Sequence, residues 1–185
     1  TGLGSALRYV MGWEDESGVA TAAGGKRIRP ALCLFGAEAA GGAAADGLPG
    51  AVAVELVHNF SLVHDEIQDH DADRHGRPTL WARLGEAQSI NAGDLLYPRA
   101  VAALTDGAGP VERRMAALAV LNRAIAAMIE GQWRDIGFET RDSVTVDDYV
   151  AMSAGKTGAL LGAPLEMGAL LAGATADVAS RFGLW

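Results

Sequence analysis

Residues 49–69 read PGAVAVELVHNFSLVHDEIQD, and this stretch decides the fold. Its apolar side chains recur every three or four positions, which is the spacing of one helix face: Val52, Leu56, Phe60 and Val63. Pro49 suits the first turn of a helix, where a backbone N–H is not needed. The pattern predicts a helix from Pro49 to about Asp69 or Asp73, ending near residues 76–78.

The rest of the chain has the same helical character. Alanine is its most frequent residue and runs of β-branched residues are short. Apolar spacing predicts further helices over 31–40, 86–104 and 111–137, and a last one that runs through 155 and beyond. Thr145 and Asp148 have the spacing of a capping box at the start of that last helix. The sequence therefore predicts an all-α protein with a single domain over residues 1–185.

Composition excludes several classes of protein. The chain has 185 residues, of which 50% are hydrophobic and 21% charged, enough to bury a sizeable core. Acidic residues outnumber basic ones by 23 to 15, a net charge of -8, which argues against nucleic acid or an anionic membrane as partner. We expect any bound anion to meet a local cationic site.

Two features bear on location. Cys33 is the single cysteine and lies in an apolar run, which suits a buried thiol in a reducing cytoplasm. The longest apolar stretch, residues 158–174, carries Pro164 and Glu166 at its centre. That pattern is typical of a buried core helix and not of a membrane span.

One window gathers the side chains that could carry chemistry. It holds every histidine and five carboxylates: His58, His64, His70, His75, Asp65, Glu66, Asp69, Asp71 and Asp73. On a helix, Asp65 and Asp69 share a face, with Asp73 one turn further if the helix persists. Like charges at this spacing repel, so a bound cation explains them better than stability does. Oxygen ligands without a thiolate indicate Mg²⁺, which takes its remaining ligands from water and substrate phosphates.

Other interpretations of this window are weaker. Asp69, Asp71 and Asp73 have the spacing that opens an EF-hand loop. Arg74 and Leu80 then occupy the sixth and twelfth positions, where that loop needs Gly and Glu, so a calcium loop is excluded. The histidines are five or six residues apart, which does not suit zinc. A solvated acidic helix end stays open as an alternative for the window taken alone.

Lysine is rare in this chain. Among 15 basic residues only Lys26 and Lys156 are lysines, and each follows a glycine. A lysine offers a compact point charge that suits a phosphate oxygen. The alternative is two ordinary surface lysines.

Six ordered motifs bring these residues together. They are GKRIRP (25–30), ELVHNFSLVHDEIQD (55–69), RHGRPT (74–79), INAGD (90–94), EGQ (130–132) and GKT (155–157). In this order they closely resemble the trans-isoprenyl diphosphate synthases, also called polyprenyl synthetases, over nearly the whole chain. The resemblance implies an isoprenoid-synthase-type helical bundle around a central cavity, and a homodimer.

The resemblance also implies a reaction. Mg²⁺ helps to ionise an allylic diphosphate, the double bond of isopentenyl diphosphate attacks the resulting carbocation, and a proton is lost. Metal ions and cationic side chains suit this chemistry because they neutralise the leaving diphosphate. We expect a short-chain product of C15 to C20, with Phe60 as the bulky floor that limits chain growth.

Roles follow position by position. The residues implied in catalysis are Asp65, Asp69, Lys156 and Thr157, and those implied as metal ligands are Asp65, Glu66 and Asp69. Lys26, Arg29 and His58 would hold isopentenyl diphosphate. Arg74, Gln132 and Lys156 would face the allylic diphosphate. For His58 and Gln132, a satisfied polar group in a helix interface is the alternative.

The chain departs from the family pattern at three places. Glu66 stands where the family usually has the second Asp of its first aspartate-rich motif. His75 replaces the second Arg of a pair, and a neutral imidazole lacks the permanent charge and forked geometry of Arg. After Lys156 the carboxylates are Glu166 and Asp177, so the family's second aspartate-rich motif is missing.

These departures leave alternatives open. The preferred expectation is part of a longer enzyme, truncated before the second motif. One alternative is a terpene synthase-like enzyme that ionises an allylic diphosphate without condensing it, motivated by His75. Another is a non-catalytic partner subunit, motivated by Glu66 and the missing motif.

Overall fold

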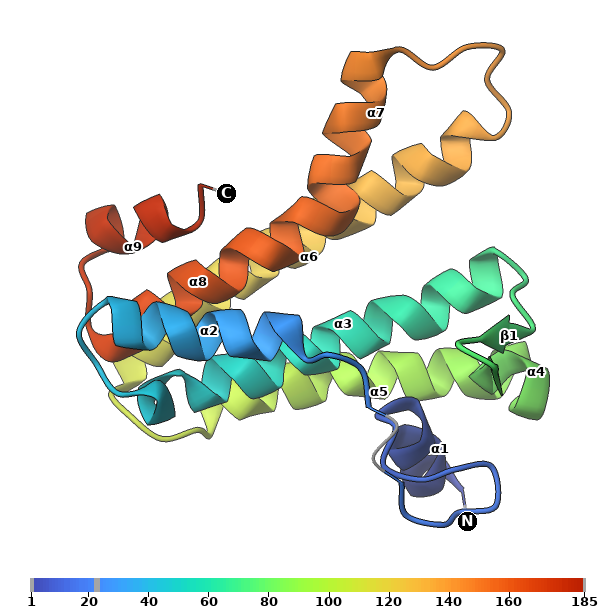
Figure 1. Cartoon of the computed structure of the whole chain (residues 1–185), viewed down its shortest axis with the longest axis horizontal. Helices are drawn as coiled ribbons and strands as arrows, with labels where there is room; N and C mark the ends of the chain where they lie inside the picture. The colour runs from blue at the N-terminus through green and yellow to red at the C-terminus, as the bar shows by residue number, and fades with distance from the viewer. Residues whose placement is uncertain (1, 22–23, 185) are drawn as a thin grey trace. The chain divides into compact units, whose positions relative to one another are not determined.

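The computed structural model describes residues 2–21 and 24–184 and confirms the all-α prediction (Figure 1). Its helices are α1 (Leu3–Val10), α2 (Ile28–Ala39), α3 (Leu48–Gln68), α4 (Leu80–Leu84), α5 (Glu86–Thr105), α6 (Val111–Phe138), α7 (Val146–Ser153), α8 (Ala159–Ala172) and α9 (Ala176–Phe182). A 3₁₀ turn, η1, covers Ala44–Gly47, and a π turn, η2, covers Ala154–Gly158. The strands β1 (Asp73–Arg74) and β2 (Arg77–Pro78) form a short antiparallel hairpin.

The chain divides into two compact units. Unit 1 comprises Thr1–Arg27 and Glu55–Val101, and unit 2 comprises Ile28–Val54 and Ala102–Trp185. The boundary between the two units falls within α3 and within α5, so each of these helices belongs partly to unit 1 and partly to unit 2. The first aspartate-rich motif therefore belongs to unit 1, and the GKT motif belongs to unit 2.

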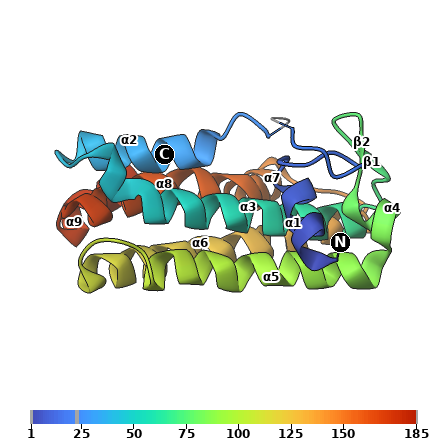
Figure 2. The same ribbon diagram turned by 90° about the horizontal axis from the view of Figure 1, so that it is seen from below.

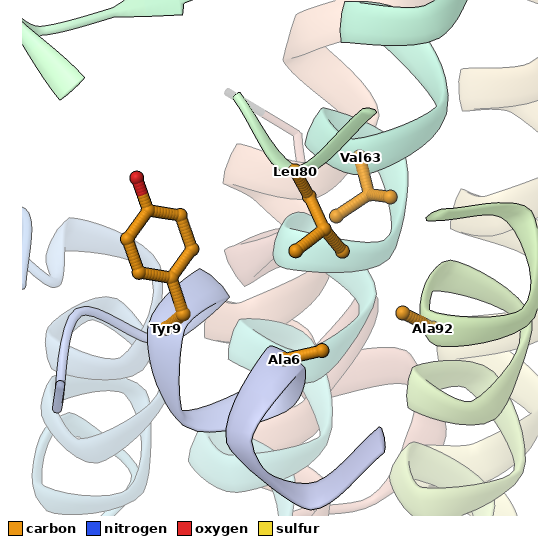
Figure 3. Close-up of a cluster of buried hydrophobic side chains, with 5 residues drawn as sticks. All are labelled: Ala6, Tyr9, Val63, Leu80 and Ala92. Carbon is orange, nitrogen blue, oxygen red and sulfur yellow. The ribbon is translucent and has the colours of Figure 1, made fainter. Parts of the chain in front are cut away.

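A small apolar cluster holds unit 1 together. Ala6 and Tyr9 of α1 meet Val63 of α3, Leu80 of α4 and Ala92 of α5, and all five are at least 93% buried (Figure 3). Burial of these side chains stabilises the position of α1, because apolar surface removed from water contributes about 25 cal/mol per Å². The sequence pattern did not predict α1.

Helix α3 ends earlier than the longer of the two predicted boundaries. His70 has a left-handed backbone with φ of 55°. Its N–H donates to the Ile67 carbonyl at 3.3 Å, and the N–H of Asp71 donates to the Glu66 carbonyl at 3.1 Å. These two bonds close the helix as a Schellman motif. The extension to Asp73 is therefore wrong, because Asp73 lies in β1.

The β1–β2 hairpin turns on two residues with positive φ. Arg74 pairs with Arg77, and the intervening His75 and Gly76 have φ of 52° and 73°. Two consecutive left-handed residues are typical of a type I′ hairpin turn. Figure 2 shows both strands beside α4. The hairpin was not predicted, and it fixes the directions of Arg74 and His75.

Helix α8 is the core of unit 2. It packs along α2 and α6, as Figures 1 and 2 show for α2, and it is buried over most of its length. Gly168 is essential to this contact, since a Cβ there would lie 2.0 Å from the Cys33 carbonyl oxygen. The predictions of a buried core helix over 158–174 and of a buried Cys33 are both confirmed.

The segment around the GKT motif is less regular than predicted. The Thr145 hydroxyl accepts the Asp148 N–H at 3.1 Å and Asp148 accepts the Thr145 N–H at 3.3 Å, so the capping box is confirmed. The helix then loosens into η2 before α8 begins. Across 2–21 and 24–184, none of the helices has both the length and the apolar character needed to cross a membrane.

Candidate active site

Unit 1 contains a cavity of about 260 Å³. Its walls come from the end of α1, residues 24–27, one face of α3 and the hairpin. Five basic side chains line it: Arg27, His58, Arg74, His75 and Arg77. The carboxylates in its lining are Glu55 and Glu66. Three guanidinium groups against two carboxylates give the lining a positive balance of charge, which favours an anionic ligand.

Arg27 anchors one wall of the cavity. It has a left-handed backbone with φ of 51°, and its guanidinium forms an ion pair with Glu55. A second bond runs from Arg27 Nη2 to the Met11 carbonyl at 2.7 Å. Asn59 Nδ2 donates to Glu55 Oε1 at 3.3 Å and holds that carboxylate in place. Gly24 makes room for this arrangement, since a Cβ there would lie 2.5 Å from Arg27 Nη2.

Arg74 connects the cavity to the aspartate motif. Its Nη1 lies 3.8 Å from Asp65 Oδ2, and its Nε lies 3.8 Å from Glu66 Oε1. These distances are longer than direct hydrogen bonds, so the attraction is chiefly Coulombic. Arg74 therefore lines the cavity and at the same time interacts with two of the predicted metal ligands.

The predicted Mg²⁺ ligands differ in their surroundings. Asp65 is half-buried and Asp69 is exposed, one turn apart at the end of α3. Within the described residues, no three His, Cys, Asp or Glu side chains converge on one point that could hold a metal ion. Two carboxylates that leave positions for water and phosphate are nevertheless the donor set typical of Mg²⁺. Asp65 and Asp69 fit that ion.

Glu66 has a different environment from the two aspartates. It is 8% exposed and lines the cavity. Burial raises the pKa of its carboxyl above the ordinary value, the Arg74 charge opposes that rise, and the Asp65 and Asp71 charges add to it. The backbone amide of Leu80 acts against this rise and lowers the pKa of the carboxyl slightly. The role of Glu66 as a metal ligand stays a prediction.

His64 and Phe60 form an aromatic group on α3. Their rings meet edge to face at 4.7 Å, and Tyr97 of α5 lies 6.3 Å from Phe60. His64 Nε2 lies 3.4 Å from Asp94 Oδ1. Gly93 leaves space for the imidazole, because a Cβ there would lie 2.8 Å from His64 Nε2. The INAGD motif thus packs against the aspartate-bearing helix.

Lys156 is positioned by unit 2. It lies on η2, and its ammonium group forms an ion pair with Asp135 of α6. Gly131 and Gly155 allow η2 to approach α6: a Cβ at Gly131 would lie 2.1 Å from Lys156 N, and one at Gly155 would lie 2.8 Å from the Ala127 carbonyl. The EGQ and GKT motifs are therefore packing partners. A π turn within a helix is frequently found at functional sites.

The remaining predicted site residues are distributed over both units. In unit 1, His58 and Arg74 line the cavity and Lys26 is exposed. In unit 2, Arg29 and Gln132 are half-buried and Thr157 is exposed beside Lys156. The structure thus brings His58, Glu66 and Arg74 together in one cavity.

Sequence patterns missed several residues that shape this cavity. Tyr9, Glu55, Asn59 and Arg77 all line it. Glu55 and Arg77 lie inside the quoted motifs, but no periodicity or spacing rule marks them. Tyr9 lies in the unpredicted α1. The Gly of the His75-Gly76 pair was the sequence signal available for the hairpin, because Gly is common at the second position of a two-residue hairpin turn.

Comparison with known proteins points to one family. Residues 15–184 match the sequence model of the family described as polyprenyl synthetase. A (2E,6E)-farnesyl diphosphate synthase of Mycobacterium tuberculosis is 47% identical over 173 residues, which are 93% of this chain and 48% of that protein. A geranylgeranyl diphosphate synthase of Methanosarcina mazei is 46% identical over 157 residues, 85% of this chain and 48% of that protein.

The fold has close counterparts among solved structures. The crystal structure of a polyprenyl synthetase from Streptomyces coelicolor matches with a TM-score of 0.92 and 42% identity, over 98% of this chain and 53% of that one. A geranylgeranyl pyrophosphate synthetase from Geoglobus acetivorans matches with a TM-score of 0.88 and 37% identity, over 97% of this chain and 56% of that one. The chain spans about half the length of these relatives.

Proposed function

The chain belongs to the polyprenyl synthetase family, and on that basis we propose that it acts as a Mg²⁺-dependent trans-prenyltransferase. The proposed reaction condenses an allylic diphosphate with isopentenyl diphosphate into a short-chain product of C15 to C20. The names of its relatives, which include farnesyl and geranylgeranyl diphosphate synthases, support that range of product length.

One observation carries this proposal: a cation-lined cavity lies beside the aspartates of α3 within a single unit. Arg74 lies 3.8 Å from both Asp65 and Glu66 and lines the cavity. A diphosphate needs cationic contacts, and its departure as a leaving group needs further neutralisation. The arrangement of Arg74 and Asp65 offers both at neighbouring points.

Asp65 and Asp69 are the proposed metal ligands. Glu66, the third ligand expected from the sequence, lines the cavity, and among the described residues it does not converge with both aspartates on one point that could hold a metal ion. Mg²⁺ bound there would neutralise charge on the allylic diphosphate and make it a better leaving group. The chain's own contribution is to hold the two carboxylates one turn apart at the end of α3 and to place Arg74 beside Asp65.

The substrate contacts are proposed residue by residue. Lys26, Arg29 and His58 would bind isopentenyl diphosphate, while Arg74, Gln132 and Lys156 would face the allylic diphosphate. Lys156 and Thr157 are proposed to lie near the carbon that gains positive charge when the diphosphate leaves. The ion pair with Asp135 supports a defined position for Lys156.

Phe60 is the proposed floor of the product site. Its ring is held edge to face by His64, which in turn lies beside Asp94. A ring fixed in this way resists displacement by a growing apolar chain. This supports a role for Phe60 in limiting product length.

The experiment uses the full-length gene product with Mg²⁺, labelled isopentenyl diphosphate and dimethylallyl, geranyl or farnesyl diphosphate. We expect label in products of C15 to C20. Absence of any product longer than the allylic substrate would overturn the proposal. Cyclised or hydrolysed product without uptake of label would instead indicate the terpene synthase-like reaction, and inertness relieved by a homologue would indicate a partner subunit.

The homodimer, the cytoplasmic location and the single domain over 1–185 stay predictions.

A further inference from the structure

We infer that Arg77 supplies a permanent positive charge that binds isopentenyl diphosphate in the unit 1 cavity. This inference rests on the proposed function, because it assigns a substrate contact within it. Arg77 follows the turn of the hairpin and lines the cavity together with His75. Both imidazoles in the lining carry charge only when protonated, so among the lining residues a permanent positive charge comes from arginine.

The three cavity arginines are not equivalent. Arg27 forms an ion pair with Glu55, and Arg74 lies within 3.8 Å of both Asp65 and Glu66. Over the described part of the chain, no carboxylate oxygen lies within 4.0 Å of the Arg77 guanidinium. The pKa of the half-buried Asp15 carboxyl is lowered chiefly by hydrogen bonds from Ser17 and from the Val19 N–H, and the Arg77 charge adds to that effect. Of the three cavity arginines, Arg77 is therefore the one whose positive charge is least neutralised by carboxylates of the protein.

Arg77 is also held ready for a ligand. Its Nη2 donates to the Glu14 carbonyl at 2.9 Å, and its guanidinium lies 4.3 Å from the centre of the Tyr9 ring. Tyr9 is itself fixed, because its hydroxyl donates to the Pro78 carbonyl at 2.6 Å. One of five N–H donors is used in the Glu14 bond, so others remain for phosphate oxygens. A guanidinium already ordered by stacking loses little further freedom on binding.

The position of Arg77 indicates which of the two diphosphate substrates it would bind. Arg74, its partner in the hairpin register, is drawn towards Asp65 and Glu66. Arg77 instead contacts Tyr9 and Glu14, so it serves a diphosphate that binds without the proposed metal ligands. That substrate is isopentenyl diphosphate, which keeps its diphosphate during the reaction.

Arg83 provides a matched control. Its guanidinium lies 4.0 Å from the centre of the same Tyr9 ring, and its Nη2 donates to the Glu16 carbonyl at 2.8 Å. It therefore makes the same kinds of structural contact as Arg77. The cavity lining includes Arg77 but not Arg83. A purely structural role predicts similar effects for both residues, whereas a ligand role predicts an effect for Arg77 alone.

The test titrates isopentenyl diphosphate, without Mg²⁺, into the full-length gene product and its variants by calorimetry. For Arg77→Gln we expect the Kd to rise about tenfold to a hundredfold, the loss expected for one charge-assisted hydrogen bond. Arg83→Gln should leave the Kd within about twofold, and the KM for the allylic diphosphate should stay within about twofold in both variants. Adding His75→Arg to Arg77→Gln should restore most of the affinity, because it returns a permanent charge to the same cavity.

Equal Kd values for the wild type and Arg77→Gln, or equal losses in Arg77→Gln and Arg83→Gln, would overturn the inference. If Arg77→Gln does not fold, modification of wild-type arginines with phenylglyoxal decides the question. Isopentenyl diphosphate should then protect Arg77 and not Arg83, and equal modification of Arg77 with and without ligand would overturn the inference. Failure of the wild type to incorporate isopentenyl diphosphate at all would contradict the proposed function, whereas an active wild type with an unaffected Arg77→Gln variant contradicts this assignment alone.

Discussion

The backbone of Lys156 lies directly against Gly131, so that a Cβ on Gly131 would come within 2.1 Å of the Lys156 nitrogen. The contact joins the EGQ motif of α6 to the π turn that carries the GKT motif. It also brings the Lys156 ammonium group to Asp135, one turn further along α6. A side chain as small as a methyl group at position 131 would therefore displace the lysine.

Gly131→Ala tests this contact. Because backbone atoms of η2 cannot move aside as a flexible side chain can, we expect the free energy of unfolding to fall by about 3 kcal/mol, the upper range for overpacking. Gly137→Ala is the control on the same helix, since nothing lies within 4 Å of its added Cβ. That variant should be unchanged or more stable by up to about 1 kcal/mol, through helix propensity. Urea unfolding of both variants provides the comparison, and equal stabilities would refute the close contact.

Lys156→Met tests the placement of the lysine charge. If the ammonium group faces the allylic diphosphate, its loss should raise the KM for that substrate about tenfold, which corresponds to about 1.4 kcal/mol. The KM for isopentenyl diphosphate should change little. Lys156→Arg should recover part of the loss, because it keeps the charge but changes its shape. Steady-state kinetics with each substrate varied in turn measures both KM values. A change in the KM for isopentenyl diphosphate alone would contradict the assignment.

Helices were the part of the structure that the sequence made predictable. Apolar spacing at Val52, Leu56, Phe60 and Val63 marks α3, because one face of a buried helix repeats with the helical period. The two turns after α3 were missed because His70 and His75 take left-handed conformations that are usually assigned to Gly or Asn. Both histidines adopt this conformation in a short local structure, the Schellman motif after α3 and the turn of the hairpin, where Gly or Asn is the residue that sequence patterns mark.

The candidate site was predictable in part for a similar reason. Asp65 and Asp69 could be paired from their spacing alone, since a helix brings positions four apart together. Arg77 and Tyr9 could not, because they are 68 positions apart in the sequence and only the folded chain stacks one on the other. The ion pair between Arg27 and Glu55 likewise joins two separate motifs.

Cys33 offers a test of the unit 2 core. Burial raises the pKa of its thiol to about 12 from a reference of 9.0, so the folded protein holds this proton more tightly than the unfolded chain. The contribution of this protonated thiol to the free energy of unfolding is fully present below about pH 9. It is lost as the pH rises towards 12. At pH 8 we expect the Cys33 thiol of the native protein not to react with Ellman's reagent. In roughly 8 M urea, which unfolds domains of this size, we expect this thiol to react. Rapid reaction of the native protein would contradict the buried environment.

The most direct test of the account compares the Mg²⁺-dependent incorporation of isopentenyl diphosphate by wild-type protein, Asp65→Ala and Asp69→Ala. The exposed Asp142→Ala serves as the control carboxylate. Because the two aspartates are the proposed metal ligands, each of their variants should lose at least about a thousandfold in kcat, or about 4 kcal/mol, while retaining a native thermal transition. Asp142→Ala should match the wild type. Wild-type turnover in Asp65→Ala and Asp69→Ala at the same Mg²⁺ concentration would contradict the central claim.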